Sequence, residues 1–412
     1  MNGDQELINQ LFRKEFSKMV AVISKTFGLE HIEMAEDIVS GTFLQAMENW
    51  KEKGIPANPT AWLYTVAKNN TLQEFRRNNI LMTKVIPELK STQALSSEEG
   101  DIDFSSGNIN DSQLQMMFAI CDEAIASEAQ MALALRVLCG FGIDEIAKAF
   151  LTNKETINKR LLRAKERLRV EQIKLVMPST SDIDQRLGNV LHIIYLLFNE
   201  GYYSTSQDQV LRQEFCQEAL RLGLMLSQFQ PTNQPRTNAL LALICFHASR
   251  FDARLHDESG FILYEDQDET LWDRELIRQG VDFLNKAATG DQLSSYHLEA
   301  GIAYWHCQKE DTSEKWSNIL YHYDLLMQVN NSPGVALNRA YAVYKVRGRS
   351  AALMEAEKLQ LTADHFYYTL LGELYTNLDN RQARTNYLKA ISLASTETEK
   401  RTLQNKIDAL YN

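Results

Sequence analysis

Glycine and proline, the residues that most often interrupt regular structure, are scarce in this chain: 18 glycines and 7 prolines among 412 residues. Together they make up about 6% of the sequence, roughly half of their usual combined share. Glycine supplies the backbone angles of tight turns, and proline is excluded from helix interiors and central strands. A fold of many short strands needs such residues at every turn. The chain is therefore predicted to be all-α.

Apolar residues recur at helical spacing along most of the chain. Between residues 35 and 50 they fall three or four positions apart, which places them on one face of an amphipathic helix. Hydrophobic residues make up 44% of the chain and charged residues 24%, an ordinary balance for a globular protein with buried cores. At roughly 150 residues per domain, the length indicates two to four domains.

Several classes of protein are excluded by what the sequence lacks. The longest apolar runs, such as 191–198 and 240–248, are far shorter than the ~20 residues that cross a bilayer. The first ten residues are polar and lack the apolar core of an export signal, so a cytoplasmic protein with no membrane partner is predicted. The five cysteines are scattered and odd in number, which argues against a disulfide framework and predicts buried thiols without chemistry.

No catalytic or metal-binding pattern stands out. Four acids lie within residues 265–269, but they lack the spaced ligands and the glycine turn of a calcium loop. The histidines show no HExxH or other ligand spacing and are interpreted as ordinary core or surface residues. We therefore expect no metal, no cofactor and no enzymatic activity.

Changes in composition divide the chain into segments. Residues 91–112 contain six serines, five acids and no lysine or arginine, a composition that predicts a flexible acidic linker. The predicted segments are a helical block at 1–80, the linker at 81–112, a second helical block at 113–178, a helical extension at 179–290 and a repeat domain at 291–412.

The repeat domain is predicted from a recurring pattern of small and large residues. Ala340, Val343, Ala352 and Ala356 are followed about 32 positions later by Gly372, Tyr375, Ala383 and Tyr387. This interval is close to the 34-residue period of tetratricopeptide helix pairs, in which small residues allow two helices to approach. The pattern indicates degenerate repeats of that kind.

The second helical block contains two short helices joined by a turn at Leu151–Asn153, the pattern of a helix-turn-helix. Thr152 and Glu155 are spaced as a capping box at the start of the second helix. That helix, residues 154–169, carries seven basic residues and two acids, although the whole chain has a net charge of −11. Local charge decides nucleic-acid binding more than the sum does, so this helix is predicted to enter a DNA major groove.

The helical projection assigns residues of this second helix to the contact with DNA. The projection places Thr156, Lys159, Leu162 and Arg163 away from the apolar stripe, where they would reach base edges, and Arg160 beside that stripe. Cations beside this row, Lys165 and Arg167 among them, are expected to hold phosphates. The alternative is a solvated basic face on an ordinary core helix.

The first block offers a second candidate surface, in which basic and aromatic residues lie at one edge. Such a combination suits unstacked bases, since aromatic rings stack on them and cations hold the backbone. The predicted residues are Lys53, Asn58, Trp62, Lys68, Arg76 and Arg77, with Tyr64 beside them. A purely structural helix explains Trp62 equally well.

At the level of whole segments the chain resembles a known family. AEDIVSGTFLQAMENW and NPTAWLYTVAKNNTLQEFRR in the first block, and GFGIDEIAKAFLTNKETINKRLLRAKERLR in the second, resemble regions 2 and 4 of bacterial extracytoplasmic-function sigma factors of the sigma-70 family. YLLFNEGYYS, YEDQDETLWDRELI, AGIAYWH and SPGVALNRAYAV resemble the subgroup with a long, helical, tetratricopeptide-like C-terminal domain. The resemblance extends from about residue 6 to 410.

The resemblance implies partners and roles. The partners are core RNA polymerase, through its β′ clamp helices and β flap, and promoter DNA. The helix face with Asp37, Gly41, Leu44 and Glu48 would dock on the clamp helices. The residues of the first-block surface would bind the −10 element. The contact residues of the basic helix, to which the resemblance adds Asn158, would read the −35 element. The family usually has Gln-Glu where this chain has Ser40 and Gly41.

The function implied is that of an alternative sigma factor, which directs RNA polymerase to promoters and whose activity its C-terminal extension governs. Two alternatives remain. One is a helix-turn-helix transcriptional activator whose helical repeats sense a ligand or a protein partner, and the other is a repeat scaffold whose N-terminal blocks only bind partners.

Overall fold

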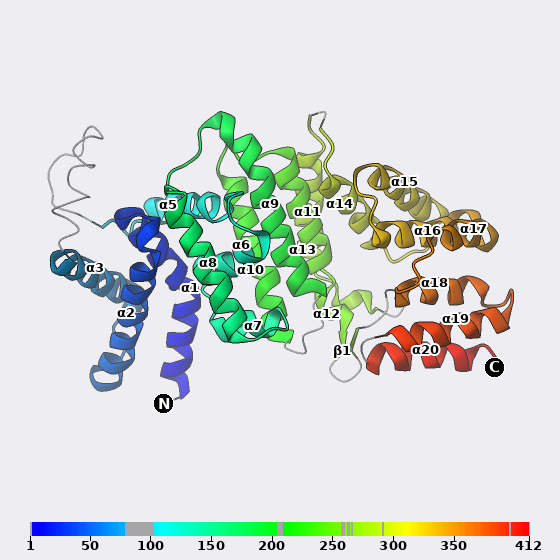
Figure 1. The fold of residues 1–412 in the computed structure, drawn as a ribbon, viewed down its shortest axis with the longest axis horizontal. Coiled ribbons are helices and arrows are strands. Elements are labelled where there is room, and N and C mark those ends of the chain that lie inside the picture. The colour runs from blue at the N-terminus through cyan, green and yellow to red at the C-terminus, as the bar shows by residue number, and fades with distance from the viewer. Residues whose placement is uncertain are drawn as a thin grey trace. The chain divides into compact units, whose positions relative to one another are not determined.

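The computed structural model describes residues 2–78, 102–203, 209–256, 260–261, 264, 267–290, 292–394 and 397–411. The described chain is built almost entirely of helices, which confirms the predicted all-α class (Figure 1). Among the described residues, the strands are β1 (Leu255–His256) and β2 (Gly260–Phe261), an antiparallel pair of two residues each. The chain forms two compact units, Met1–Asn233 and Gln234–Asn412.

The first unit is organised around its N-terminal helix. Its helices are α1 (Asn2–Phe27), η1 (Leu29–His31), α2 (Ile32–Lys53), α3 (Pro59–Asn78), α5 (Ser106–Ile120), α6 (Ser127–Val137), α7 (Ile143–Ala149), α8 (Lys154–Val170), α9 (Thr180–Tyr203) and α10 (Gln209–Gln228). Helix α1 packs against α2, α3, α5 and α6. Its side chains Phe16, Met19 and Ile23 are fully buried, so both predicted helical blocks share one core.

The predicted linker at 81–112 is ordered in its last part, which corrects the expectation of a flexible segment there. Helix α5 begins at Ser106, and the hydroxyl of Ser105 accepts a hydrogen bond from the Asn108 amide at 3.4 Å. Ile102 is only 3% exposed and packs with Ile109 and Val22 of α1. Averaged composition hid these apolar residues among the acids and serines. Residues 81–101 lie outside the described part of the chain.

A buried ion-pair network ties the two predicted blocks together. Glu36 of α2 is only 6% exposed, and its carboxylate lies 2.8 Å from Nε of Arg136 in α6 and 2.7 Å from Nζ of Lys165 in α8. Breaking a buried pair by removing one partner leaves an uncompensated charge and typically costs 3–5 kcal/mol. In this structure the two blocks are therefore held together rather than merely tethered.

The predicted boundary at residues 178/179 does not separate packed units. Helices α9 and α10 pack on α5, α6 and α7, and the division lies at residues 233/234. Arg186 of α9 donates to the carbonyl of Phe118 at 3.0 Å and pairs with Asp122 at 2.9 Å. The ring of Phe215 lies 4.6 Å from that of Phe141. The predicted extension is thus split, because the apolar faces of its first two helices are buried on the block before it.

This packing predicts where the chain can be shortened. A chain that ends after Asn233 is expected to keep the stability of the first unit, whereas one that ends after Pro178 uncovers side chains such as Phe141. Exposing each such fully buried side chain costs about 1.5–3 kcal/mol, so the shorter chain should lose several kcal/mol. Urea denaturation followed by circular dichroism measures both chains, and equal midpoints would show that α9 and α10 add nothing to this core.

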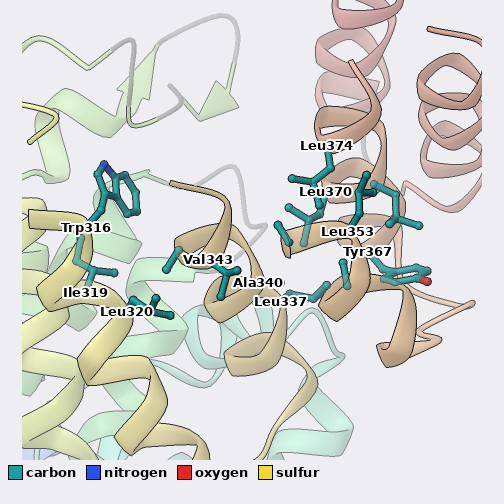
Figure 2. Close-up of a cluster of buried hydrophobic side chains, with 14 of the residues drawn as sticks. Trp316, Ile319, Leu320, Leu337, Ala340, Val343, Leu353, Tyr367, Leu370 and Leu374 are labelled. Carbon is teal, nitrogen blue, oxygen red and sulfur yellow. The ribbon is translucent and has the colours of Figure 1, made fainter. Parts of the chain in front are cut away.

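The second unit is a succession of packed helices. Its elements are α11 (Pro235–Ala248), α12 (Phe251–Arg254), the β1 and β2 strands, η4 (Glu269–Leu271), α13 (Arg274–Ala287), α14 (Ser295–His306), α15 (Ser313–Val329), α16 (Pro333–Arg347), α17 (Arg349–Leu359), α18 (His365–Tyr375), α19 (Asn380–Leu393) and α20 (Glu397–Ala409). From α14 on, each helix packs against the next. Figure 2 shows how Trp316, Val343, Leu353 and Leu370 join α15–α18 in one buried cluster.

The small residues of the predicted repeats lie where helices meet. Ala340 and Ala356 are buried between α16 and α17. In the following pair, a Cβ added at Gly372 would lie 2.6 Å from the ring of Tyr387, so only glycine lets α18 approach α19 this closely. The recurring small and large residues thus mark two successive helix pairs.

Candidate nucleic-acid interface

The four residues predicted to dock on polymerase lie along the solvent-facing side of α2. Asp37, Leu44 and Glu48 are exposed and Gly41 is half-buried, while the opposite face of the helix is buried in the core. Leu44 is 60% exposed, on the side of the helix away from its buried apolar face. The stripe offers one apolar contact flanked by carboxylates.

A groove of about 550 Å³ lies beside this stripe. It is lined by Met34, Asp37, Ile38 and Gly41 of α2 and by Asn70, Gln73 and Glu74 of α3. A Cβ added at Gly41 would meet no atom within 4 Å, so the glycine is not required by the packing and leaves the groove open. Sequence reasoning found the stripe but missed the α3 side of the groove, because no periodic pattern marks polar groove residues.

The residues assigned to unstacked bases lie around the start and along the length of α3. Lys53 is exposed at the end of α2. The Asn58 side chain accepts a hydrogen bond from the Ala61 amide at 3.0 Å and so caps the helix. The Trp62 ring packs edge-on against Trp50, with 5.4 Å between the ring centroids. Asn58 and Trp62 therefore have structural roles in this state.

The remaining members of that set are less fully described. Lys68 is half-buried on α3. Arg76 and Arg77 lie in the last turn of α3, and their side chains fall outside the described part of the structure. The described members of the set thus follow one edge formed by the end of α2 and by α3.

An aromatic side chain from the segment before α5 covers part of this edge. The ring of Phe104 stacks on that of Tyr64, with centroids 4.8 Å apart and planes inclined by 14°. The Tyr64 hydroxyl donates to the Glu15 carboxylate at 2.5 Å, and burial together with this carboxylate raises the pKa of the phenol. Sequence reasoning missed Phe104, although it is the one aromatic residue in the acidic stretch. The Tyr64 ring is thus occupied by a neighbour in the same chain.

Helix α8 presents its predicted contact row to solvent. Asn158, Lys159 and Arg163 are exposed, and Leu162 is 63% exposed even though it is apolar. The apolar face made by Ile157, Leu161, Ala164 and Leu168 is buried. The row therefore projects from a rigid, packed helix.

The other members of the predicted set are partly covered. Thr156 and Arg160 are half-buried, and the Arg160 guanidinium carbon lies 5.8 Å from the centre of the Phe150 ring. Lys165 and Arg167, predicted to hold phosphates, are engaged within the protein. Lys165 pairs with Glu36, and Arg167 lies 3.2 Å from Glu171. The local sequence showed the charge of these residues but not their partners.

The turn between α7 and α8 differs from the prediction in its cap. The residue before α8 is Asn153, whose side chain accepts from the Thr156 amide at 2.8 Å, so the predicted Thr152 capping box is wrong. Leu151 has a left-handed φ of 47° and is exposed. Asparagine is as good an N-cap as serine or threonine, and the turn is one residue longer than the capping box required.

The rest of the described chain offers few groups suited to catalysis or metal binding. All five cysteine side chains are buried, as predicted, and burial raises the pKa of Cys121 and of Cys245 to about 12. Among the described residues, no three histidine, cysteine, aspartate or glutamate side chains gather as metal ligands. No described helix has both the length and the apolar character needed to span a membrane.

Two family models match parts of the chain, and the first of them covers α2 and α3. Residues 13–80 match the model of sigma-70 region 2, and residues 186–288 match a family of unknown function, DUF6596. The chain is 31% identical to the uncharacterized protein R00370 of Rhizobium meliloti over 386 residues, which cover 92% of this chain and 90% of the relative. The chain therefore belongs to one family with this relative, and its residues 13–80 are similar to sigma-70 region 2.

Proposed function

We propose that the protein is an alternative sigma factor of the extracytoplasmic-function type. In this proposal α2 docks on the β′ clamp helices of core RNA polymerase, α3 binds the −10 element and the helix-turn-helix formed by α7 and α8 reads the −35 element and meets the β flap. One observation carries the proposal: a chain with a region 2 match also presents helix α8, outside that match, with Lys159 and Arg163 in its exposed row. A region 2 that acted alone would not need it.

The charge balance explains why polymerase is required. A chain with a net charge of −11 is repelled by DNA at long range, and a few phosphate contacts give only weak binding of roughly 10⁻⁴ to 10⁻⁶ M at physiological salt. Attachment to polymerase makes the second contact intramolecular, at an effective concentration of around mM. Two weak surfaces then suffice for promoter selection.

The ion pairs of Glu36 bear on how the protein engages a promoter. The −10 and −35 elements are separate along DNA, whereas Glu36 links α2 to α8 through Lys165 at 2.7 Å. We infer that docking on polymerase separates α8 from α2. Glu36 and Lys165 would then contact solvent or polymerase instead of each other. The state in which α8 packs on α2 would therefore be the resting form of the protein.

The C-terminal unit is proposed to govern this activity through a tetratricopeptide-like surface. Its successive helix pairs support that assignment, because such pairs build extended surfaces for protein or small-molecule partners. The protein would act in the cytoplasm, where polymerase and promoters are found.

Reconstituted transcription tests the proposal. Core polymerase, a promoter fragment and the full chain are expected to give a run-off transcript, while the chain alone binds the same fragment poorly. Specific binding without polymerase, and no transcript with it, would instead favour a conventional activator. Repeating the assay with a chain that ends after Asn233 measures how the C-terminal unit affects transcription. Equal amounts of transcript from both chains would contradict a regulatory role for that unit.

The stacking of Phe104 on Tyr64 gives a second test at the −10 surface. Phe104→Ala is expected to raise the affinity for a single-stranded −10 oligonucleotide by about tenfold, because stacking a base on an aromatic ring is worth about 1–3 kcal/mol. Fluorescence anisotropy with the labelled oligonucleotide measures the change. Phe366→Ala, which removes an exposed aromatic ring from the second unit, serves as the matched control. Unchanged or weaker binding by Phe104→Ala would show that Tyr64 is not a base-stacking surface.

A further inference from the structure

We propose that the second unit contains a binding site for the oxyanion of a small molecule, a phosphate or a carboxylate, held by Arg250 and Lys315. The site lies where the segment after α11 meets the end of α14 and the start of α15, around the ring of Tyr264. It is independent of the polymerase and promoter contacts proposed above, which belong to the first unit.

Arg250 is a buried cation, and the part of the chain that the structure describes offers it no counter-charge. It is only 7% exposed, and its guanidinium carbon lies 5.5 Å from the centre of the Tyr264 ring. Its Nε is buried and has no hydrogen-bond partner. Among the described residues, no carboxylate lies within ion-pair distance of its guanidinium. A buried polar group that makes no hydrogen bond lowers the stability of the fold by about 1–3 kcal/mol, and by more when the group is charged.

Lys315 is a second buried cation beside the same ring. It is only 1% exposed, and its Nζ donates to the Tyr264 hydroxyl at 2.8 Å and to the Gln308 carbonyl at 2.6 Å, both neutral acceptors. Its Nζ lies 4.8 Å from the Tyr264 ring centre. Burial, reinforced by Arg250 and other cations nearby, lowers the pKa of Lys315 to about 8 in spite of the attraction of Asp311.

The carboxylate that attracts Lys315 is committed elsewhere. Asp311 accepts a hydrogen bond from Nε1 of Trp316 and pairs with Nζ of Lys345 at 2.7 Å. It lies beyond ion-pair distance of Lys315. Two buried cations thus adjoin one ring and repel each other, and no carboxylate of the described residues is shared between them.

The geometry of these groups suits an oxyanion. A guanidinium presents a planar fork that binds two oxygens of a carboxylate or phosphate, and an ammonium binds a third acceptor as a point charge. The adjacent His306 supplies another polar atom, because its buried Nδ1 also lacks a partner. Its ring lies 5.1 Å from that of Tyr264, and burial lowers the pKa of this imidazole to about 3, so it stays neutral.

The burial of both cations identifies the ligand as a small molecule. Side chains that are more than nine-tenths buried cannot reach the phosphates of a DNA backbone or an acidic face of another protein. The aromatic rings of Tyr264 and Trp316, within 5.8 Å of Lys315 Nζ, form a low-dielectric surrounding in which a charge-assisted hydrogen bond is strong. The site would therefore select a small molecule for its negatively charged oxygens, which phosphates and carboxylates share.

Isothermal titration calorimetry of the full chain tests the proposal, with inorganic phosphate and acetate as separate probes at constant ionic strength. At least one of them is expected to bind saturably. Arg250→Gln and Lys315→Met should each weaken that binding at least about tenfold, and Arg250→Lys should fall between, since it keeps the charge and loses the fork. The matched controls Arg347→Gln and Lys358→Met remove exposed cations of the same unit and should leave binding unchanged.

Thermal unfolding in anion-free buffer separates binding from a purely structural role. Lys315→Met is expected to unfold at the same temperature as the natural chain or higher, because it removes an unpaired buried charge. Binding of phosphate alone assigns a phosphate ligand, and binding of acetate alone assigns a carboxylate. The proposal is overturned if neither probe binds saturably, if the controls weaken binding equally, or if Lys315→Met lowers the unfolding temperature while binding is retained.

Discussion

Reversing the charges of Lys159 and Arg163 together is expected to reduce promoter-directed transcription at least ~100-fold, since each lost base or phosphate contact costs about 1–3 kcal/mol. Both side chains are exposed on the solvent side of α8 and make no ion pair among the described residues, so the substitutions should not disturb the fold. Run-off transcription with core polymerase measures the effect. Binding to core polymerase, followed by co-elution, is expected to stay intact.

The matched control carries the same charge change to another helix. Arg381 and Lys389 are exposed on α19, and Arg381→Glu with Lys389→Glu changes the net charge equally without touching α8. This control separates a local contact from a general loss of attraction to DNA. If the control reduced transcription as much as the α8 variant, α8 would have no specific role. Loss of polymerase binding by the α8 variant would show that α8 faces polymerase rather than DNA.

Substitutions on α2 are expected to act on polymerase binding instead of on the contact with promoter DNA. Asp37→Lys combined with Leu44→Asp should lower the affinity for core polymerase by at least ~100-fold, because residues central to an interface commonly contribute 2 kcal/mol or more each. Leu44 is 60% exposed, so replacing it leaves no cavity and the protein should remain folded. Transcription should then be lost from every promoter. Co-elution with core polymerase and circular dichroism of the variant measure the two effects.

Glu30→Lys combined with Gln45→Asp provides the control for α2. Both residues are exposed, at or near the same helix, and lie outside the predicted stripe. Polymerase binding that survives Asp37→Lys with Leu44→Asp would remove α2 from the interface. Binding that is lost in both pairs would show that any change of charge near α2 is disruptive, and that the groove beside Asp37 and Gly41 is not a specific site.

The sequence predicted most of what depends on neighbours close along the chain. The apolar face of α8 and the exposed row beside it both follow from a period of 3.6 residues, and Lys159 of the predicted row is exposed while Ile157 on the opposite face is buried. The burial of the cysteines followed from their residue type and from the absence of paired spacing. The cap of α8 was missed because Thr152 and Asn153 are both suitable, and the backbone turn selects between them.

The sequence could not predict which helices pack against one another. No local pattern pairs Glu36 with Arg136 and Lys165, which lie 100 or more positions away along the chain. The end of the first unit at Asn233 depends on α9 and α10 covering an earlier block. Phe104 was assigned to a linker because averaged composition does not show where one ring finds a partner.

The amino-acid sequence by itself determined the helical class, the basic row on one helix and the resemblance to the sigma-70 family, since each is recorded in residues a few positions apart. Only the tertiary structure decided that α8 is tied to α2 through Glu36, that Phe104 covers Tyr64, and that Arg250 and Lys315 meet around one ring. These features join residues distant in sequence. Their energies come from burial and from charge in a low-dielectric interior, which no local pattern records.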